Sequence, residues 1–225
     1  MVHELLLLPS PLLPVSAYDG LAATLQQTGA DVRLALLPKD DVPHAKTLVR
    51  TWSAMVGPGT TLIAHSNAGY LAPSVRDRAG TNARVIFMDA ALPPESGPTC
   101  LAPSQFRDHL SSLAGDDGLL PPWTRWWSRE DLDGVIPADD FDHLDRDCPR
   151  LPLSYFDAQL VAPQGWVEAP NAYLAFDTTY ARELTLAQER GWPHTVTRGG
   201  HLHFLLEPVT VAAKILHLIE RLPRS

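Results

Sequence analysis

Short apolar runs alternate with amphipathic stretches along the first 90 residues. Runs that are apolar on both faces are typical of strands in a parallel sheet. They cover residues 4–8, 32–37, 60–64 and 83–88. Between them, apolar side chains recur three or four positions apart, as in helices with one buried face. These stretches cover residues 17–28, 42–56 and 67–77. The alternation predicts βαβ units, and therefore an α/β protein whose mostly parallel sheet is flanked by helices on both sides.

The pattern changes between residues 92 and 168. Many of the 21 prolines fall here, in stretches such as "GLLPPWTRWWSREDL" and "PADDFDHLDRDCPRLP". Because proline lacks the backbone N–H that regular elements need, this region should consist of short helices and turns. The α/β pattern then resumes, with strands predicted at 172–176 and 194–197 and helices at 178–190 and 204–221. We therefore expect a core of residues 1–91 and 169–225, with residues 92–168 inserted as a helical cap or lid.

Composition narrows the class of partner. Hydrophobic residues make up 45% of the chain, enough for a sizeable core. The formal net charge of −8 argues against nucleic acid or an anionic membrane as partner, and no apolar run approaches the roughly 20 residues that span a bilayer. The apolar start lacks a basic region and contains Glu4, so a buried strand is expected rather than a secretory signal. Because the chain has only two cysteines, we expect a cytoplasmic protein. We expect it to be a monomer or a homodimer.

The strand at 60–64 ends in the sequence "TLIAHSNAGY", which places Ser66 among small residues. A serine between a strand and a helix can sit on a sharp turn that exposes its hydroxyl, and small neighbours such as Ala64 and Ala68 make room for that turn. The next backbone N–H, that of Asn67, would lie at a helix N-terminus and could stabilise an oxyanion. The alternative is that Ser66 only caps the following helix.

A base for this serine is found near the other end of the chain. A serine hydroxyl is a weak nucleophile and needs a base within hydrogen-bonding distance. In "TRGGHLHFLLEP", the glycine pair before His201 would let the loop fold back toward the sheet edge. His203 is closer to the last helix and is interpreted as a packing residue. A metal site built on these two histidines would need a third ligand, so no metal is predicted.

The order of these motifs resembles the α/β-hydrolase family. The elbow "HSNAG" and the sequence "DAALP" after the next strand are similar to a group of small bacterial serine hydrolases, which carry "HSPL" where this chain has "PSPL" at residues 9–12. The resemblance covers nearly the whole chain. It implies a cofactor-free esterase-like enzyme with Ser66 as nucleophile and His201 as base, and an oxyanion held by the backbone N–H groups of Asn67 and Leu12.

The acid that would complete a triad has two candidates. The family usually places it about four residues after the strand at 172–176, but Tyr180 stands there and Asp177 comes earlier. Some members instead place the acid after the strand that follows the nucleophile, which here gives Asp89. The role of the acid is to orient the imidazole and stabilise its charged form, and Asp89 is preferred for it. Asp177, or a Ser–His pair without an acid, remains open.

Aromatic residues in 92–168 suggest the kind of substrate. Most of them should join the short helices to the core, while Trp123, Trp126 and Trp127 are expected to line an apolar pocket. The acidic stretch at 139–147 lacks the spacing of a calcium loop. The leading hypothesis is hydrolysis of an ester or thioester of a small, mostly apolar acyl group. The alternatives are an acyltransferase in a biosynthetic pathway that uses the same acyl-enzyme, and a non-hydrolytic binding or isomerising protein on the same fold.

Overall fold

The computed structural model describes residues 2–37 and 44–223. Its centre is a six-stranded sheet in the order β2-β1-β3-β4-β7-β8, and every neighbouring pair is parallel. The strands are β1 (Glu4–Leu8), β2 (Asp31–Leu34), β3 (Thr61–Ser66), β4 (Arg84–Ala90), β7 (Asn171–Phe176) and β8 (His194–Thr197). The predicted α/β class and mostly parallel sheet are confirmed.

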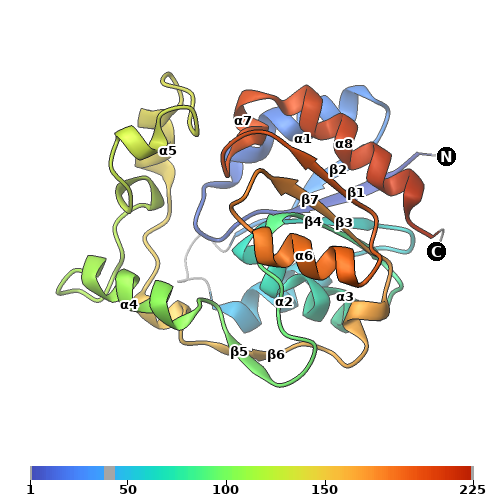
Figure 1. Cartoon of the computed structure of the whole chain (residues 1–225), viewed down its shortest axis with the longest axis horizontal. Coiled ribbons are helices and arrows are strands. Elements are labelled where there is room, and N and C mark those ends of the chain that lie inside the picture. The colour runs from blue at the N-terminus through green and yellow to red at the C-terminus, as the bar shows by residue number, and fades with distance from the viewer. Residues whose placement is uncertain (1, 38–43, 224–225) are drawn as a thin grey trace.

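Helices cover both faces of this sheet. Helices α1 (Asp19–Gln27) and α8 (Pro208–Arg221) pack together on one face (Figure 1). Helices α2 (Ala45–Ser53), α3 (Ala72–Ala79) and α6 (Ala181–Glu189) lie on the other. Right-handed crossovers place α1 on one face and α2, α3 and α6 on the other. The reason is that the chain runs toward one edge of the sheet from β1 to β2 and toward the opposite edge from β2 onward.

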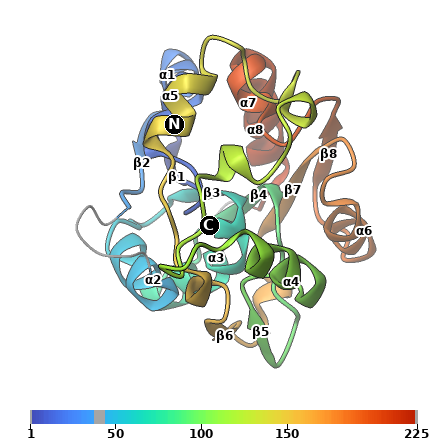
Figure 2. The ribbon, with the colours of Figure 1, turned by 90° about the vertical axis from the view of Figure 1, so that its left-hand side faces the viewer.

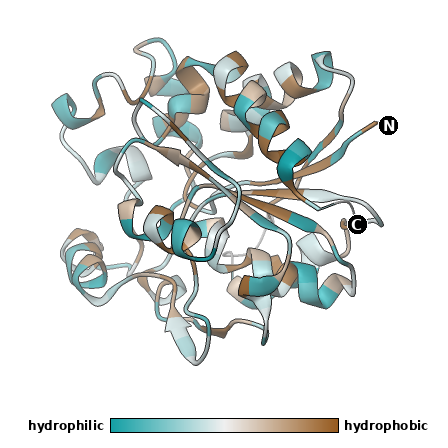
Figure 3. Ribbon diagram, turned by 45° about the vertical axis from the view of Figure 1, so that its right-hand side comes forward, coloured by the Kyte–Doolittle hydropathy of each residue, from teal (hydrophilic) through white to brown (hydrophobic). Residues whose placement is uncertain are grey.

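The four central strands are buried on both sides, which is why they appear in the sequence as continuous apolar runs. Every residue of β3 and β7 is buried, as are all but the first residues of β1 and β4. Figure 3 shows hydrophobic strands at the centre and hydrophilic segments on the outer helices. Burial of apolar surface stabilises this layer by about 25 cal/mol per Å² removed from water.

Some predicted boundaries differ from the structure. The last helix, predicted as one element, is divided into α7 (His203–Leu206) and α8. Pro208 explains the break, since it lacks the N–H that would continue α7 but suits the first position of a new helix. The helix predicted from residue 67 begins with a 3-10 turn, Asn67–Tyr70, before α3. The predicted start of the second helix, at residues 42–43, lies outside the described residues.

The segment between β4 and β7 contains α4 (Ser104–Leu113), α5 (Phe141–Asp147) and several 3-10 turns. It lies beyond one end of the sheet rather than on either face (Figures 1 and 2). Two short strands, β5 (Pro98–Cys100) and β6 (Gln159–Val161), pair antiparallel at its base. The sequence predicted only helices and turns here, because three-residue strands leave no periodic signal. No helix in the described ranges is both long and apolar enough to cross a bilayer.

Candidate active site

Ser66 lies at the end of β3 on a strained turn. Its φ is 57° and its ψ is −126°, a conformation that residues with a Cβ rarely adopt. The Ser66 carbonyl accepts a hydrogen bond from the N–H of Ala91 at 3.1 Å, which ties the turn to the end of β4. A Cβ at Gly69 would collide with the Ala91 carbonyl oxygen. The small residues noted in the sequence therefore let the turn approach β4 closely.

The structure brings Ser66, His201 and Asp89 into one hydrogen-bonded chain. His201 Nε2 lies 2.9 Å from Ser66 Oγ, and His201 Nδ1 lies 2.6 Å from Asp89 Oδ2. The second oxygen of Asp89 accepts a hydrogen bond from the N–H of Phe176 at 2.9 Å, and the carboxylate is fully buried. A carboxylate at Nδ1 requires the proton on that nitrogen, so Nε2 is left to accept the serine proton.

Asp177 does not take part in this chain. It is exposed, its backbone N–H donates to the Thr197 carbonyl at 2.9 Å, and its side chain makes no hydrogen bond within the described residues. The geometry therefore favours Asp89 over Asp177 as the acid.

A second buried histidine supports the loop of His201. His65 directly precedes Ser66 at the end of β3. Its Nδ1 is 2.7 Å from the Tyr18 hydroxyl, and its Nε2 is 3.2 Å from the His201 carbonyl oxygen. The Tyr18 oxygen also accepts the N–H of Ser10 at 2.8 Å. Burial, together with repulsion from His201, holds the pKa of His65 well below its ordinary value.

The glycine pair before His201 has a steric reason. Gly199 has a φ of 150°, and a Cβ there would collide with the imidazole of His203. His203 is buried, with its ring 5.8 Å from that of Phe176. This is the packing position predicted for it. No group of three His, Cys, Asp or Glu side chains within the described ranges is arranged to hold a metal ion.

The two predicted oxyanion donors belong to residues that border the same cavity as Ser66. The side chain of Asn67 is fixed on both sides, since its Nδ2 donates to the Leu101 carbonyl at 2.7 Å and its Oδ1 accepts from the Tyr155 hydroxyl at 2.8 Å. The N–H of Leu12 makes only a long contact, 3.4 Å, with the Ser10 hydroxyl. Leu12 is therefore weakly engaged, as a group that binds a transient oxyanion should be.

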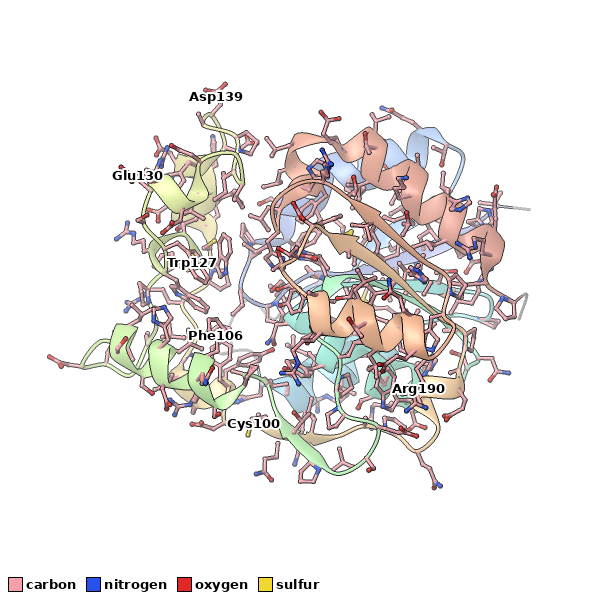
Figure 4. All side chains as sticks on the ribbon, in the orientation of Figure 1. Cys100, Phe106, Trp127, Glu130, Asp139 and Arg190 are labelled. Carbon is pink, nitrogen blue, oxygen red and sulfur yellow. The ribbon has the colours of Figure 1, made fainter. Side chains whose placement is uncertain are left out.

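The cavity has a volume of about 460 Å³ and lies between the sheet end and the β4–β7 segment. Ser66 and His201 open into it, and apolar and aromatic side chains make up most of its wall. These include Leu12, Tyr70, Leu101, Phe106, Trp123, Trp127, Leu132 and Val135. Figure 4 shows Phe106 and Trp127 on the side of the segment nearer the sheet, with Glu130 and Asp139 at its outer margin.

One of the three tryptophans expected in the pocket is elsewhere. Trp123 and Trp127 line the cavity, but Trp126 does not. Its Nε1 donates to the Pro121 carbonyl at 2.8 Å, and its ring packs 6.1 Å from that of Phe156. The prediction for Trp126 was wrong because Trp126 and Trp127, which follow the 3-10 turn Trp123–Arg125, differ in burial, and composition alone cannot resolve which of two adjacent tryptophans faces a cavity.

Tyr180 and Glu183 are polar residues of the cavity wall that were not predicted as site residues. Tyr180 occupies the position where the resemblance to the α/β-hydrolase family implied a carboxylate. Its ring centroid lies 5.6 Å from that of His201. Burial raises the pKa of its hydroxyl, which stays protonated. Glu183 follows one helical turn later in α6. Only its three-residue spacing from Tyr180 could have indicated it, since such residues share a helix face.

Comparison with known proteins shows similarity in structure only. No protein-family model matches the chain, and no curated protein matches it. An extracellular α/β-hydrolase from a Paenibacillus species superposes with a TM-score of 0.78 at 14% identity, over 97% of this chain and 99% of that one. A pyrethroid hydrolase from Sphingobium faniae gives 0.66 at 18% identity, over 98% of both chains. Tomato methylketone synthase I, complexed with 2-tridecanone, gives 0.70 at 10% identity, over 99% of this chain and 100% of that one. With this agreement over nearly the whole length, the chain has the α/β-hydrolase fold.

Proposed function

We propose that the protein is a serine hydrolase that cleaves an ester or thioester of a small, mostly apolar acyl group. The observation that carries the proposal is the chain Asp89–His201–Ser66, which ends in a hydroxyl at the wall of a cavity. A buried carboxylate, an imidazole and a serine in this order form the arrangement that activates a serine for acyl transfer.

The geometry supports a two-step reaction. Ser66 Oγ attacks the substrate carbonyl carbon while His201 Nε2 takes the hydroxyl proton, and Asp89 stabilises the imidazolium that results. The N–H groups of Asn67 and Leu12 hold the oxyanion. The C–O or C–S bond breaks, the leaving group receives the proton from His201, and an acyl ester remains on Ser66. Water then attacks this ester, gives its proton to His201, and releases the acid and free Ser66.

The cavity supports the choice of acyl group. Its volume of about 460 Å³ is at the lower end of the range for small-molecule sites, and its wall is mostly apolar. One structural neighbour is a pyrethroid hydrolase, and another is complexed with 2-tridecanone, an apolar ketone. A compact apolar ester or thioester therefore suits this cavity better than a large polar one.

Acyl transfer is the second candidate function. The same acyl-enzyme could pass its acyl group to an alcohol, amine or thiol if water were excluded. Trp127, at the wall of the cavity, is 41% exposed. Such access for solvent favours hydrolysis over transfer.

The proposal is tested with the Ser66→Ala variant. We expect the parent protein to hydrolyse short-chain aryl esters and thioesters, and to gain one covalent adduct from a fluorophosphonate probe, detected at Ser66 by mass spectrometry. The variant should lose both properties while keeping its fold by circular dichroism. Ser112→Ala, at an exposed serine of α4, is the matched control and should keep both. Full turnover by Ser66→Ala would remove the proposed nucleophile.

A further inference from the structure

The charged groups of the cavity wall are unevenly distributed. Among the described residues that line it, Asp131 and Glu183 are acidic and none is a lysine or arginine. Among the described wall residues, the only basic group is the imidazole of His201, which Asp89 already engages. An anionic ligand would therefore find no lysine or arginine among the described wall residues with which to pair. A cationic one would meet carboxylates in an enclosure less polar than water, where charge interactions are stronger.

Glu183 is the better placed of the two carboxylates. Asp131 is exposed, and its carboxylate already accepts a hydrogen bond from the Ser128 hydroxyl at 2.7 Å. Glu183 is half-buried and, within the described ranges, makes no ion pair and no side-chain hydrogen bond with another residue. Arg182 is its neighbour in sequence but is exposed. Burial raises the pKa of Glu183, and a hydrogen bond from its own backbone N–H and the charge of Arg182 offset this only in part. The carboxylate is thus available to a ligand.

Aromatic faces complete the environment. Trp123, Trp127, Tyr70 and Tyr180 line the same cavity as Glu183. The electron-rich faces of aromatic rings attract cations, and this attraction is strongest for tryptophan and for groups removed from water. Aromatic walls with one carboxylate free of an ion pair bind an ammonium group more tightly than a neutral group of the same shape. The net charge of −8 would also draw cations toward the protein.

We infer that the substrate carries a positively charged ammonium group on the part that enters the cavity, and that Glu183 binds this group. Such a substrate would be an ammonium-bearing ester or thioester whose remaining surface is apolar. This inference rests on the proposed function only for the bond that is cleaved, since recognition of the ammonium group can be measured without turnover.

The test measures binding to the Ser66→Ala protein, so that no catalysis is required. Three ligands of nearly equal size serve as probes: choline as the cation, 3,3-dimethylbutanol as its neutral isostere and 3,3-dimethylbutanoate as the anion. Calorimetric titration gives a Kd for each. We expect choline to bind about tenfold more tightly than the alcohol, as a cation–π contact together with one carboxylate predicts. The anion should bind more weakly than the alcohol.

Glu183→Gln, made in the same background, should reduce the preference for choline to about twofold. Glu189→Gln is the matched control, because it removes the same charge from an exposed position at the end of α6. It should keep the preference. Since Glu183 also lies in the first turn of α6, where a carboxylate stabilises a helix, Glu183→Asp serves as a second variant that keeps the charge and should retain part of the preference.

Equal binding of choline and the alcohol by the parent protein would overturn the inference, as would an unchanged preference in Glu183→Gln. Neither result would affect the proposed hydrolysis. Conversely, full turnover by Ser66→Ala would remove Ser66 as the nucleophile and leave the ammonium site standing.

Discussion

The imidazole of His65 stacks on that of His201, with ring centroids 4.7 Å apart and planes inclined by 27°. His65 Nε2 also donates to the His201 carbonyl oxygen, at 3.2 Å. The direction of this hydrogen bond follows from which nitrogen of the His65 ring carries the proton. The His201 carbonyl oxygen can only accept, so Nε2 carries the proton. Nδ1 of the neutral ring is then unprotonated and accepts the hydroxyl proton of Tyr18. The neutral ring of His65 therefore links the loop before α1 to the loop that carries the proposed base.

This link predicts how stability depends on pH. The pKa of His65 is well below its ordinary value of 6.5 in the folded protein, chiefly through burial. Below pH 6.5 the unfolded chain binds a proton that the folded protein does not, so stability is full above this pH and declines as pH falls. We expect the free energy of unfolding to fall by about 1.4 kcal/mol per pH unit in this range because of His65.

Urea unfolding of the parent and of His65→Gln between pH 7.5 and 5 measures this contribution. The variant should be less stable at pH 7.5 and should lose stability less steeply as the pH falls. His217→Gln, at an exposed position of α8, should retain the parent slope because that ring is hydrated in both states. Identical slopes for parent and His65→Gln would contradict the neutral assignment.

The choice between Asp89 and Asp177 predicts a large difference between two similar variants. Asp89→Asn replaces the carboxylate that lies 2.6 Å from His201 Nδ1, and its kcat should fall on the order of a thousandfold or more. Asp177→Asn should change kcat less than about twofold, because its side chain is exposed. Steady-state kinetics on one ester, with melting temperatures to confirm folding, separates the two. A comparable loss in both variants would return Asp177 to consideration.

The close approach of the serine turn to β4 predicts a strict size limit at Gly69. A Cβ there collides with the Ala91 carbonyl oxygen, so Gly69→Ala should destabilise the fold by about 1–3 kcal/mol and slow fluorophosphonate labelling of Ser66. Gly20→Ala is the matched control. No atom lies within 4 Å of a Cβ at Gly20, and alanine favours the helix by about 0.5–1 kcal/mol. Thermal unfolding and labelling rates test both variants. If the protein tolerated the two substitutions equally well, the steric argument would be contradicted.

The adjacent tryptophans of the β4–β7 segment should separate stability from activity. Trp126 is 6% exposed and packs in the core, so Trp126→Ala should cost about 3–5 kcal/mol of folding stability. Trp127 is 41% exposed and lines the cavity, so Trp127→Ala should change stability by less than about 1 kcal/mol while lowering kcat/KM. Urea unfolding and ester kinetics test both variants. A loss of stability in Trp127→Ala that matched that of Trp126→Ala would contradict the assignment.

The pattern of apolar residues determined the α/β architecture. Parallel strands buried on both faces are mostly apolar, and the predicted strand at 4–8 matches β1 in full. The motif around Ser66 and the glycines before His201 also identified two residues that the fold brings together, because steric limits on a turn are local and leave a local signal.

Tertiary structure decided what depends on residues distant in the chain. Asp89 and His201 are separated by 112 positions, and only the sheet order places β4 beside β7 and so within range of the histidine loop. The partners of His65, the burial of Trp126 rather than Trp127, and the position of Glu183 at the cavity wall are likewise set by packing between segments. Hydrophobic periodicity records which face of an element is buried, but not which distant side chain it meets there.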